Sequence, residues 1–307
     1  MNDTDNLWET ERTNLQTDEL DLMSSLEIVQ SMNREDQTVA QAVQQCLPEI
    51  AAAIDLITSA MEGQGRLFYL GAGTSGRLGA LDAYEFPPTF GVDPSLVVGV
   101  CAGIGIQDPI QSEEAEDDEA LGEWDLRRHD LTAADIVIGI AASGRTPYVL
   151  GGLKYAKSLG ARTVGLSCNK HSAVGQAADL AIEIVVGPEV LSGSTRLKAG
   201  TAQKMVLNML STGTMVRQGK VYRNYMVHLV PSNEKLRIRS LRMIEQITGA
   251  SPEKAAQAYK QSGNDIGLSI LLLSADLSLE EASAYMEKAG RRVREALHLS
   301  SQGSLSD

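Results

Sequence analysis

The sequence predicts an α/β protein built on a doubly wound, five-stranded parallel sheet. Five short runs of apolar residues lie between positions 66 and 186, and turn signals or helical segments separate them. Each run is continuously apolar rather than alternating, which is typical of strands that are buried on both faces. Aromatic residues are scarce and small residues are abundant, as in a parallel sheet that helices cover closely. A chain of 307 residues is long enough for one such domain and a smaller appendage.

The residues before the first strand predict an arm followed by helices. Residues 1–21 are polar and acidic and lack periodicity, so we expect them to be ordered only by packing on another surface. From Leu22 to Met61, apolar residues recur mostly at spacings of three and four, which indicates helices that Pro48 kinks or divides. We assign residues 1–62 to this N-terminal region and expect it to pack on the main domain.

The main domain is predicted to span residues 63–232. Its expected strands are Arg66–Gly71, Leu96–Cys101, Ile136–Ala142, Thr163–Cys168 and Leu180–Val186. Its expected helices are chiefly Arg77–Tyr84, Glu113–Arg128, Tyr148–Leu159 and Leu197–Gln218. Strands that alternate with helices predict a parallel sheet, and we expect the strand order 2-1-3-4-5.

After Pro231 the sequence becomes mostly helical. Ser251 and Pro252 provide a helix cap and a first-turn proline, and Ser278 to Glu281 has the pattern of a capping box. We therefore assign residues 233–307 to a small C-terminal helical bundle.

Composition limits the partners that this protein can have. The formal charge of -13 disfavours nucleic acid and anionic membranes, because the summed field repels polyphosphate. The cysteines, Cys46, Cys101 and Cys168, show neither disulfide nor zinc spacing, so we expect reduced thiols. The N-terminus has no apolar signal core, and no run of about 18 apolar residues occurs. These features predict a cytoplasmic protein.

The loop after the first strand has the composition of a phosphate-binding loop. Residues 71–76 match the pattern GxGxxG, but the second strand ends without the acidic residue that a dinucleotide site requires. Thr74, Ser75 and Gly76 instead offer hydroxyls and amides before a helix, which suits a single phosphate group. A tight turn without any ligand is the alternative interpretation.

A second loop of this kind follows the third strand, where Ser143, Gly144, Arg145 and Thr146 precede Pro147. Thr146 is a candidate helix cap and Pro147 a first-turn residue. In the order 2-1-3-4-5, strands one and three are neighbours at the point where the winding reverses, so both loops would face one crevice. Convergence of two hydroxyl-bearing loops predicts a phosphosugar pocket, although two unrelated capped turns would look alike.

Three further features complete the candidate site. The segment from Ser192 to Lys198 opens the long helix, and Ser194 and Lys198 are its candidate ligands, although its cations could equally be solvated. Glu85 precedes a pair of prolines, and Glu116 lies in the acidic run 113–119. Most members of such a run are ordinary surface charge, and the sequence alone does not select Glu116 among them.

Long segments of the chain resemble the N-acetylmuramic acid 6-phosphate etherases, which belong to the sugar isomerase (SIS) fold superfamily. The resemblance covers nearly the whole chain and rests on residues 71–77, 81–91, 139–149, 186–191, 193–203, 206–213 and 219–222. It implies an enzyme that eliminates the lactyl ether and adds water, giving N-acetylglucosamine 6-phosphate and D-lactate. It also implies that no metal or redox cofactor is needed.

Residue roles follow from the same resemblance. Glu85 matches the family's proposed general acid, Glu116 matches its proposed base, and Ser75 and Ser143 lie in its phosphosugar loops. The family further implies a homodimer and a C-terminal bundle that resembles a ubiquitin-associated domain. The chain departs from the family at Phe86, where cysteine is usual, and over residues 103–112, which border the proposed base.

Two other functions stay open at this point. A noncatalytic phosphosugar sensor would use a similar domain, as the related glucokinase regulatory proteins do, but the presence of both Glu85 and Glu116 argues against it. An aldose-ketose isomerase on the same fold would share proton abstraction at C2. The segments after Val186 favour the etherase.

Overall fold

The structure, a computed structural model, describes residues 8–103 and 114–303. Its strands are β1 (Leu67–Gly71), β2 (Val97–Cys101), β3 (Ile136–Ala141), β4 (Arg162–Ser167) and β5 (Leu180–Glu183). All paired strands are parallel, and the order is β2-β1-β3-β4-β5. The predicted doubly wound sheet and its order are therefore confirmed.

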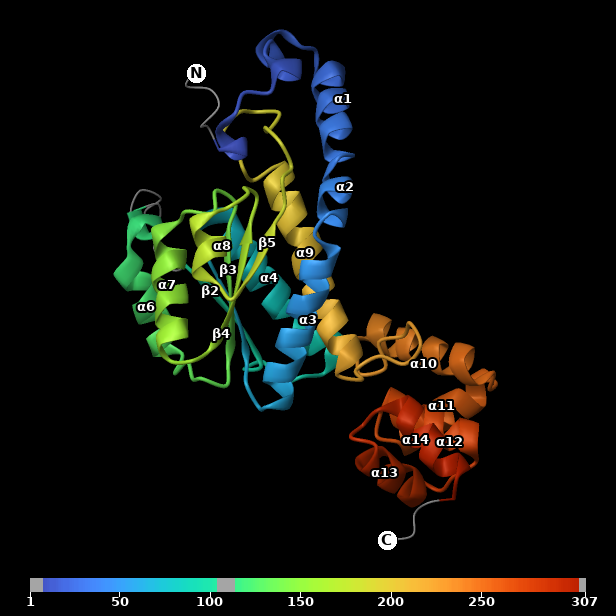
Figure 1. The fold of residues 1–307 in the computed structure, drawn as a ribbon. Coiled ribbons are helices and arrows are strands. Elements are labelled where there is room, and N and C mark those ends of the chain that lie inside the picture. The colour runs from blue at the N-terminus through green and yellow to red at the C-terminus, as the bar shows by residue number, and fades with distance from the viewer. Residues whose placement is uncertain (1–7, 104–113, 304–307) are drawn as a thin grey trace. The chain divides into compact units, whose positions relative to one another are not determined.

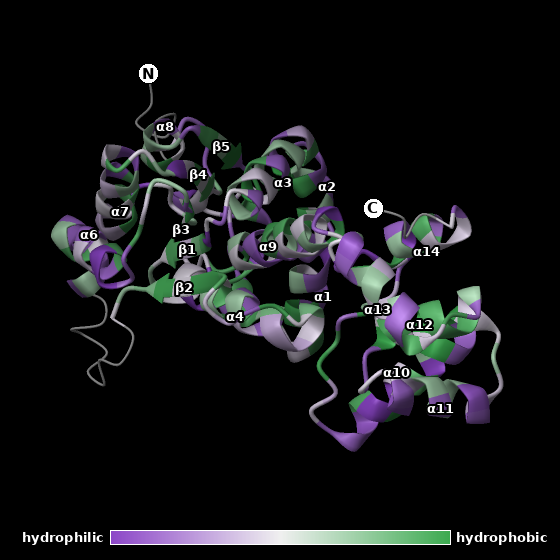
Figure 2. Ribbon diagram, turned by 90° about the horizontal axis from the view of Figure 1, so that it is seen from below, coloured by the Kyte–Doolittle hydropathy of each residue, from purple (hydrophilic) through white to green (hydrophobic). Residues whose placement is uncertain are grey.

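Helices cover both faces of this sheet (Figure 1). One layer contains α6 (Glu119–Arg128), α7 (Pro147–Ser158) and α8 (Ala173–Ala177), and the other contains α3 (Leu47–Glu62), α4 (Gly73–Phe90) and α9 (Lys198–Arg217). The strand residues are buried between the layers, and the sheet appears as an apolar centre in Figure 2. Burial on both faces explains why the runs are continuously apolar.

Helices α6 and α7 approach so closely that only glycine fits at their contact. A Cβ added to Gly151 would lie 1.9 Å from the carbonyl oxygen of Glu119, and one added to Gly122 would lie 2.0 Å from that of Tyr148. This contact fixes the start of α6, which directly follows the short 3-10 helix η5 (Ala115–Asp117). The expected helix start at Glu113 was wrong over the described residues, because Asp118 interrupts the helix and caps α6.

The region before β1 contains three short 3-10 helices, η2 (Glu9–Glu11), η3 (Leu15–Thr17) and η4 (Leu20–Leu22), then α1 (Ser25–Asp36) and α2 (Val39–Gln44). A capping box between Ser24 and Glu27 starts α1. Pro48 lies in the first turn of α3, so it separates two helices, as the sequence suggested. Within the described residues, no helix combines the length and the apolarity needed to cross a membrane.

The chain divides into two compact units, one containing Pro94–Thr214 and the residues up to Tyr84, the other Glu85–Asp93 and Met215–Asp307. The helices of the second unit are α10 (Glu234–Thr248), α11 (Pro252–Gln261), α12 (Ile266–Ala275), α13 (Leu279–Lys288) and α14 (Val293–Ser301). Tyr222, Val227 and Leu229 pack into the apolar core of these helices. The contacts therefore begin this unit earlier than residue 233, where the sequence suggested a boundary.

Candidate active site

The loops that follow β1 and β3 begin at the same edge of the sheet. Gly71, the last residue of β1, pairs with Ile140 of β3 and with Cys101 of β2. Parallel strands that end level bring their following loops together, and this is the point where the winding of the sheet reverses. We call residues 72–76 the β1 loop and residues 142–146 the β3 loop.

The β1 loop turns tightly into α4 and is held by a buried amide. Gly73 has a φ of +52°, which favours glycine, and a Cβ added to Gly76 would lie 2.5 Å from Cys101 Sγ. The hydroxyl of Ser75 donates to Oε1 of Gln203 at 2.9 Å, and both residues are buried. Nε2 of Gln203 is buried and has no partner among the described residues. No local pattern predicts that Gln203 contacts this loop, because the contact joins residues 128 positions apart.

The β3 loop also contains a left-handed glycine, Gly144, with a φ of +72°. Thr146 occupies the N-cap position of α7, but its side chain makes no capping bond. Its hydroxyl instead donates to Oε1 of Glu116 at 3.1 Å. The sequence therefore identified the position of Thr146 and missed the partner of its hydroxyl, which lies thirty residues away.

Glu116 is bonded to the β3 loop and adjoins the β1 loop. Besides the bond from Thr146, its Oε2 lies 4.0 Å from the place that a Cβ on Gly73 would take. Other described acidic residues of the run point elsewhere: Asp118 accepts the amide of Leu121 at 3.0 Å, and Glu119 pairs with Lys154 at 2.7 Å. Glu116 is thus the carboxylate of the run that is bonded to the β3 loop, a contact that the sequence could not reveal. Residues 104–113, which hold most of the departing segment and the start of the run, lie outside the described residues.

The two candidate cations are engaged within the chain. Arg145 forms an ion pair with Glu11 at 3.0 Å, and Lys198, which is buried, forms one with Glu35 at 2.5 Å. Ser194 lies in the turn before α9, where its amide donates to the carbonyl of Leu191. These contacts tie Arg145 and Lys198 to the N-terminal region.

A buried carboxylate, Glu189, caps the start of α9. Its two oxygens accept the amides of Lys198 and Ala199, each at 2.9 Å. Burial raises the pKa of Glu189, and these amides and the charge of Lys198 oppose that rise. A Cβ on Gly200, in the next turn, would lie 3.7 Å from Thr74 Cγ2, so this capped end of α9 adjoins the β1 loop. Sequence analysis did not identify Glu189.

Glu85 is exposed on α4, ten residues after Ser75, which is roughly three helical turns. It belongs to the second compact unit. Within the first unit, the structure brings together the two loops and Glu116.

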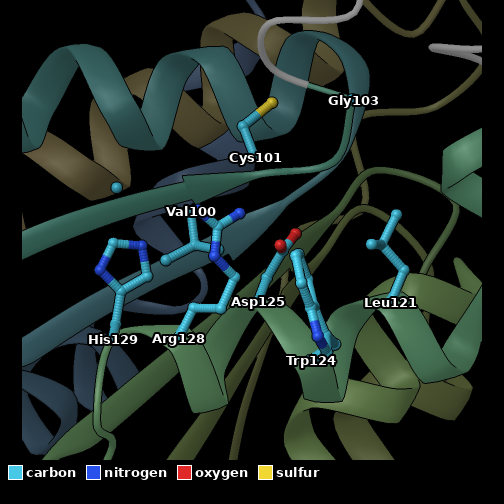
Figure 3. Close-up of a pocket in the computed structure, with 9 residues that line it drawn as sticks. Val100, Cys101, Gly103, Leu121, Trp124, Asp125, Arg128 and His129 are labelled. Carbon is cyan, nitrogen blue, oxygen red and sulfur yellow. The ribbon is translucent and has the colours of Figure 1, made fainter.

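A cavity of about 340 Å³ lies at the open edge of β2 (Figure 3). Trp124, Asp125, Arg128 and His129, from α6 and its C-terminal end, face Val100 of β2, and Cys101 of the same strand also lines the cavity, with its thiol directed toward α4. The guanidinium of Arg128 lies over the Trp124 ring, 4.6 Å from its centre. Burial raises the pKa of the Cys101 thiol, which keeps it protonated at neutral pH. Of the residues that line this cavity, Cys101 is the one whose side chain lies next to the β1 loop, at Gly76.

Groups of three or more His, Cys, Asp or Glu side chains that could hold a metal ion are absent from residues 8–103 and 114–303.

Comparison with known proteins identifies relatives over nearly the full chain. Residues 49–157 match the family model described as the glucokinase regulatory protein N-terminal SIS domain, and residues 120–213 match the SIS domain. The N-acetylmuramic acid 6-phosphate etherase of Pectobacterium atrosepticum is 53% identical over 94% of this chain and 95% of its own. The enzyme of the same name from Mesorhizobium japonicum is 52% identical over 94% of each chain.

Among solved structures, the phosphoheptose isomerase of Francisella tularensis is 16% identical and covers 63% of this chain, with a TM-score of 0.48. The full-length sequence relatives are far more similar. On their identity and coverage, this chain belongs to the N-acetylmuramic acid 6-phosphate etherase family.

Proposed function

We propose that this protein is an N-acetylmuramic acid 6-phosphate etherase, a carbon-oxygen lyase that releases D-lactate and forms N-acetylglucosamine 6-phosphate. Relatives of that name match more than nine-tenths of the chain. The observation that carries the proposal is the position of one carboxylate, Glu116, which is bonded to the β3 loop and adjoins the β1 loop. A carboxylate beside a phosphosugar pocket is what abstraction of a carbon-bound proton requires.

In this mechanism the two loops hold the phosphate. Amides at the start of α4 and the hydroxyl of Ser143 would bind its oxygens, since helix N-termini favour anions. The hydroxyl of Ser75, which donates to Gln203, would exchange that bond for one to the phosphate. Thr74, Gly76, Gly144 and Thr146 complete the two loops, and Ser194 and Lys198 belong to the adjoining start of α9. Anchoring the phosphate fixes the sugar, so that C2 and C3 are held close to the carboxylates.

The carboxylates then share the chemistry. The open-chain aldehyde acidifies the hydrogen on C2, and Glu116 removes that proton as the base. The bond between C3 and the ether oxygen breaks as a double bond forms between C2 and C3, and Glu85 gives the leaving lactate its proton. Water then adds at C3 and a proton returns to C2. Thr146 donates to one oxygen of Glu116 and leaves the other for the substrate.

Two glutamine variants test these roles separately. Glu116→Gln should lower D-lactate release by roughly 100- to 10,000-fold and should stop exchange of the C2 hydrogen with deuterated water. Glu85→Gln should lower lactate release by a similar factor and retain C2 exchange, because only the leaving group lacks its proton. Asp117→Asn, a change of the exposed neighbour of Glu116, is the matched control and should leave both rates unchanged.

Other outcomes would point to the alternative functions. Wild-type protein that binds N-acetylglucosamine 6-phosphate and releases no lactate would be a noncatalytic sensor. Interconversion of an aldose phosphate and a ketose phosphate by the same protein would assign an isomerase. Both would contradict the etherase proposal.

We further propose that the protein acts in the cytoplasm as a homodimer. Support comes from exposed apolar side chains before and within α1, namely Leu15, Leu22, Leu26 and Val29, of which Leu22 is 76% exposed. Leu26 and Val29 are three residues apart on α1, so they share one face of that helix, and Leu22 lies in η4 shortly before it. We call these three exposed residues the apolar stripe. An exposed stripe of this kind is typical of a protein interface.

A further inference from the structure

The β3 loop is held from behind by the residues that follow β4. The amide of Cys168 donates to the carbonyl of Ala142 at 3.0 Å, and the amide of Val174 donates to that of Gly144 at 2.8 Å. Between them, Nδ2 of Asn169 donates to the carbonyl of Ser143 at 3.0 Å and to that of Ala142 at 3.3 Å. The carbonyls of three consecutive loop residues are therefore all bound on the β4 side.

This arrangement matters for a loop that binds an anion. A carbonyl oxygen carries partial negative charge and would repel a phosphate, whereas an amide or a hydroxyl would attract it. Because these carbonyls are bound by residues that follow β4, the amides and hydroxyls of the β3 loop are left to face a phosphate on the other side. Asn169 is the only side chain among the described residues that donates to the carbonyl of Ser143.

Asn169 also joins the loop to the beginning of the chain. Nδ2 of Asn169 donates to Oγ1 of Thr10 at 3.1 Å, and Oδ1 accepts the amide of Thr10 at 3.4 Å. Both residues are 1% exposed. We call residues 8–17 the strap. A buried amide that is bonded on both sides transmits the position of one segment to the other.

Two more contacts fix the strap at this edge of the sheet. Glu11, the neighbour of Thr10, pairs with Arg145 of the β3 loop at 3.0 Å. The hydroxyl of Thr17 donates to the carbonyl of Val190, just after the buried cap residue Glu189, at 2.8 Å. The strap thus reaches both sides of Ser143 and Gly144, through Asn169 on one side and Arg145 on the other.

From these contacts we infer that Asn169 is a positioning residue for phosphosugar binding, and that the strap is part of the binding site through its bonds to Asn169. The inference rests on the proposed function, since it takes the β3 loop as a phosphate ligand. Asn169 itself touches neither the phosphate nor the reacting carbons, and it acts through the carbonyl of Ser143.

Asn169→Ala removes the donor without adding charge. The dissociation constant of N-acetylglucosamine 6-phosphate, measured by calorimetry, should rise roughly tenfold, as should KM for N-acetylmuramic acid 6-phosphate. The turnover number should change by less than about threefold, because Glu116 keeps its contact with Thr146. Ile182→Ala, a buried truncation in β5, is the control for general destabilisation and should lower the melting temperature without weakening phosphosugar binding.

The Thr10→Val variant tests the strap, because valine has nearly the same shape as threonine but lacks the hydroxyl that accepts from Asn169. It should weaken binding by roughly threefold, and it should add nothing in the Asn169→Ala background, because the link is already broken there. It also provides an independent test if Asn169→Ala does not fold.

The results separate this inference from the proposed function. Wild-type protein that binds no phosphosugar would overturn the proposed function. Tight wild-type binding with unchanged binding by Asn169→Ala, or equal weakening by Ile182→Ala, would overturn the role of Asn169. Unchanged binding by Thr10→Val would overturn the role of the strap.

Discussion

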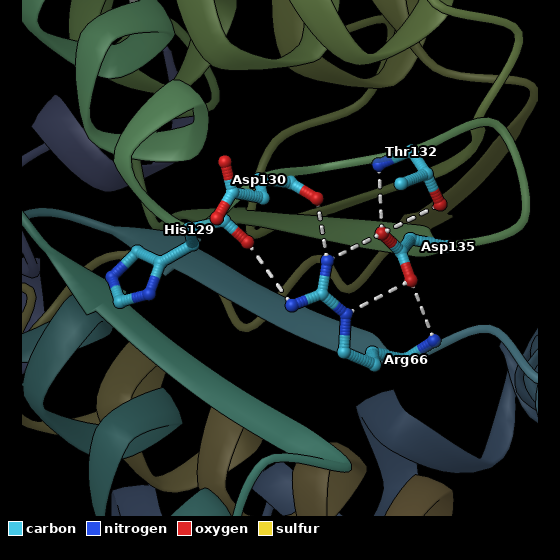
Figure 4. Close-up of polar contacts among 5 residues, drawn as sticks. All are labelled: Arg66, His129, Asp130, Thr132 and Asp135. Atoms are coloured by element: carbon cyan, nitrogen blue, oxygen red, sulfur yellow. Dashed lines mark hydrogen bonds and ion pairs between the residues drawn. The ribbon is translucent and has the colours of Figure 1, made fainter.

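At the scale of single residues, buried polar side chains hold the edges of the sheet together. Asp135, just before β3, is 2% exposed and accepts the amide of Arg66 at 2.7 Å and that of Thr132 at 2.8 Å (Figure 4). The guanidinium of Arg66 pairs with both carboxylate oxygens, with Oδ2 at 2.9 Å and with Oδ1 at 3.2 Å, and it also donates to the carbonyls of His129 and Asp130. Asp135 therefore joins β1 to the turn before β3, at the end of the sheet opposite the site.

We expect Asp135→Asn to lower the free energy of unfolding at pH 7 by about 2–4 kcal/mol, because Arg66 would lose its buried partner. Burial alone would raise the pKa of Asp135, but the Arg66 guanidinium and the amides of Thr132 and Arg66 outweigh burial and lower it. A lowered folded pKa stabilises the protein above the unfolded value of about 3.9, and this contribution is lost as the pH falls through the folded value.

Urea unfolding at several pH values measures the free energy of unfolding of both proteins and how it falls with pH. The wild type should lose stability below about pH 4 more steeply than Asp135→Asn, which lacks the titrating group. Glu62→Gln, a change of an exposed carboxylate, is the matched control and should follow the wild type. Identical pH profiles for wild type and Asp135→Asn would contradict the role of this carboxylate.

At the scale of elements, the contact between α6 and α7 determines where Glu116 lies. Gly151 of α7 meets the first residue of α6 backbone to backbone, and Glu116 is only a few residues before that point. Thr146, the other partner in this arrangement, directly precedes α7. The distance between the two helices therefore sets the distance between Glu116 and the β3 loop.

Gly151→Ala should destabilise the protein by about 1–3 kcal/mol, because the added carbon overlaps the carbonyl of Glu119. It should also lower the turnover number by roughly 100-fold, since a displacement of about 1 Å at a catalytic group has that effect. Lactate release and thermal unfolding measure the two effects. Lys154→Ala, which removes only the exposed ion pair with Glu119, should change stability by less than about 1 kcal/mol and should keep full turnover. Full turnover by Gly151→Ala would show that the contact does not position Glu116.

At the scale of the whole molecule, the proposed homodimer depends on the acidic surface and on the apolar stripe before and within α1. The charge of -13 keeps copies apart unless an apolar surface joins them. The double variant Leu22→Asp, Leu26→Asp places charge in the stripe and should convert a dimer into monomers, measured by analytical ultracentrifugation. Leu159→Asp, a change of a partly exposed leucine on the opposite layer, is the control and should stay dimeric. A dimer that persists in the double variant would place the interface elsewhere.

Much of the fold could be predicted because it depends on local patterns. Strand order, the two loops and the division by Pro48 all follow from apolar runs, glycines and prolines that neighbours in the sequence reveal. The start of α6 could not be predicted, since Asp118 competes with helix formation inside a run of acidic residues that all look alike. The pairing of Arg145 with Glu11 was equally hidden, because 134 residues separate them.

The sequence by itself determined the parallel sheet, the pair of phosphate-type loops and the resemblance to the etherase family. Tertiary structure alone decided which carboxylate of the run is bonded to the β3 loop, and it showed that Asn169, Gln203 and Glu189 support the two loops. The physical reason is the range of each interaction. Apolar periodicity and turn chemistry act between near neighbours, whereas a buried polar side chain finds its partner only after distant elements have packed.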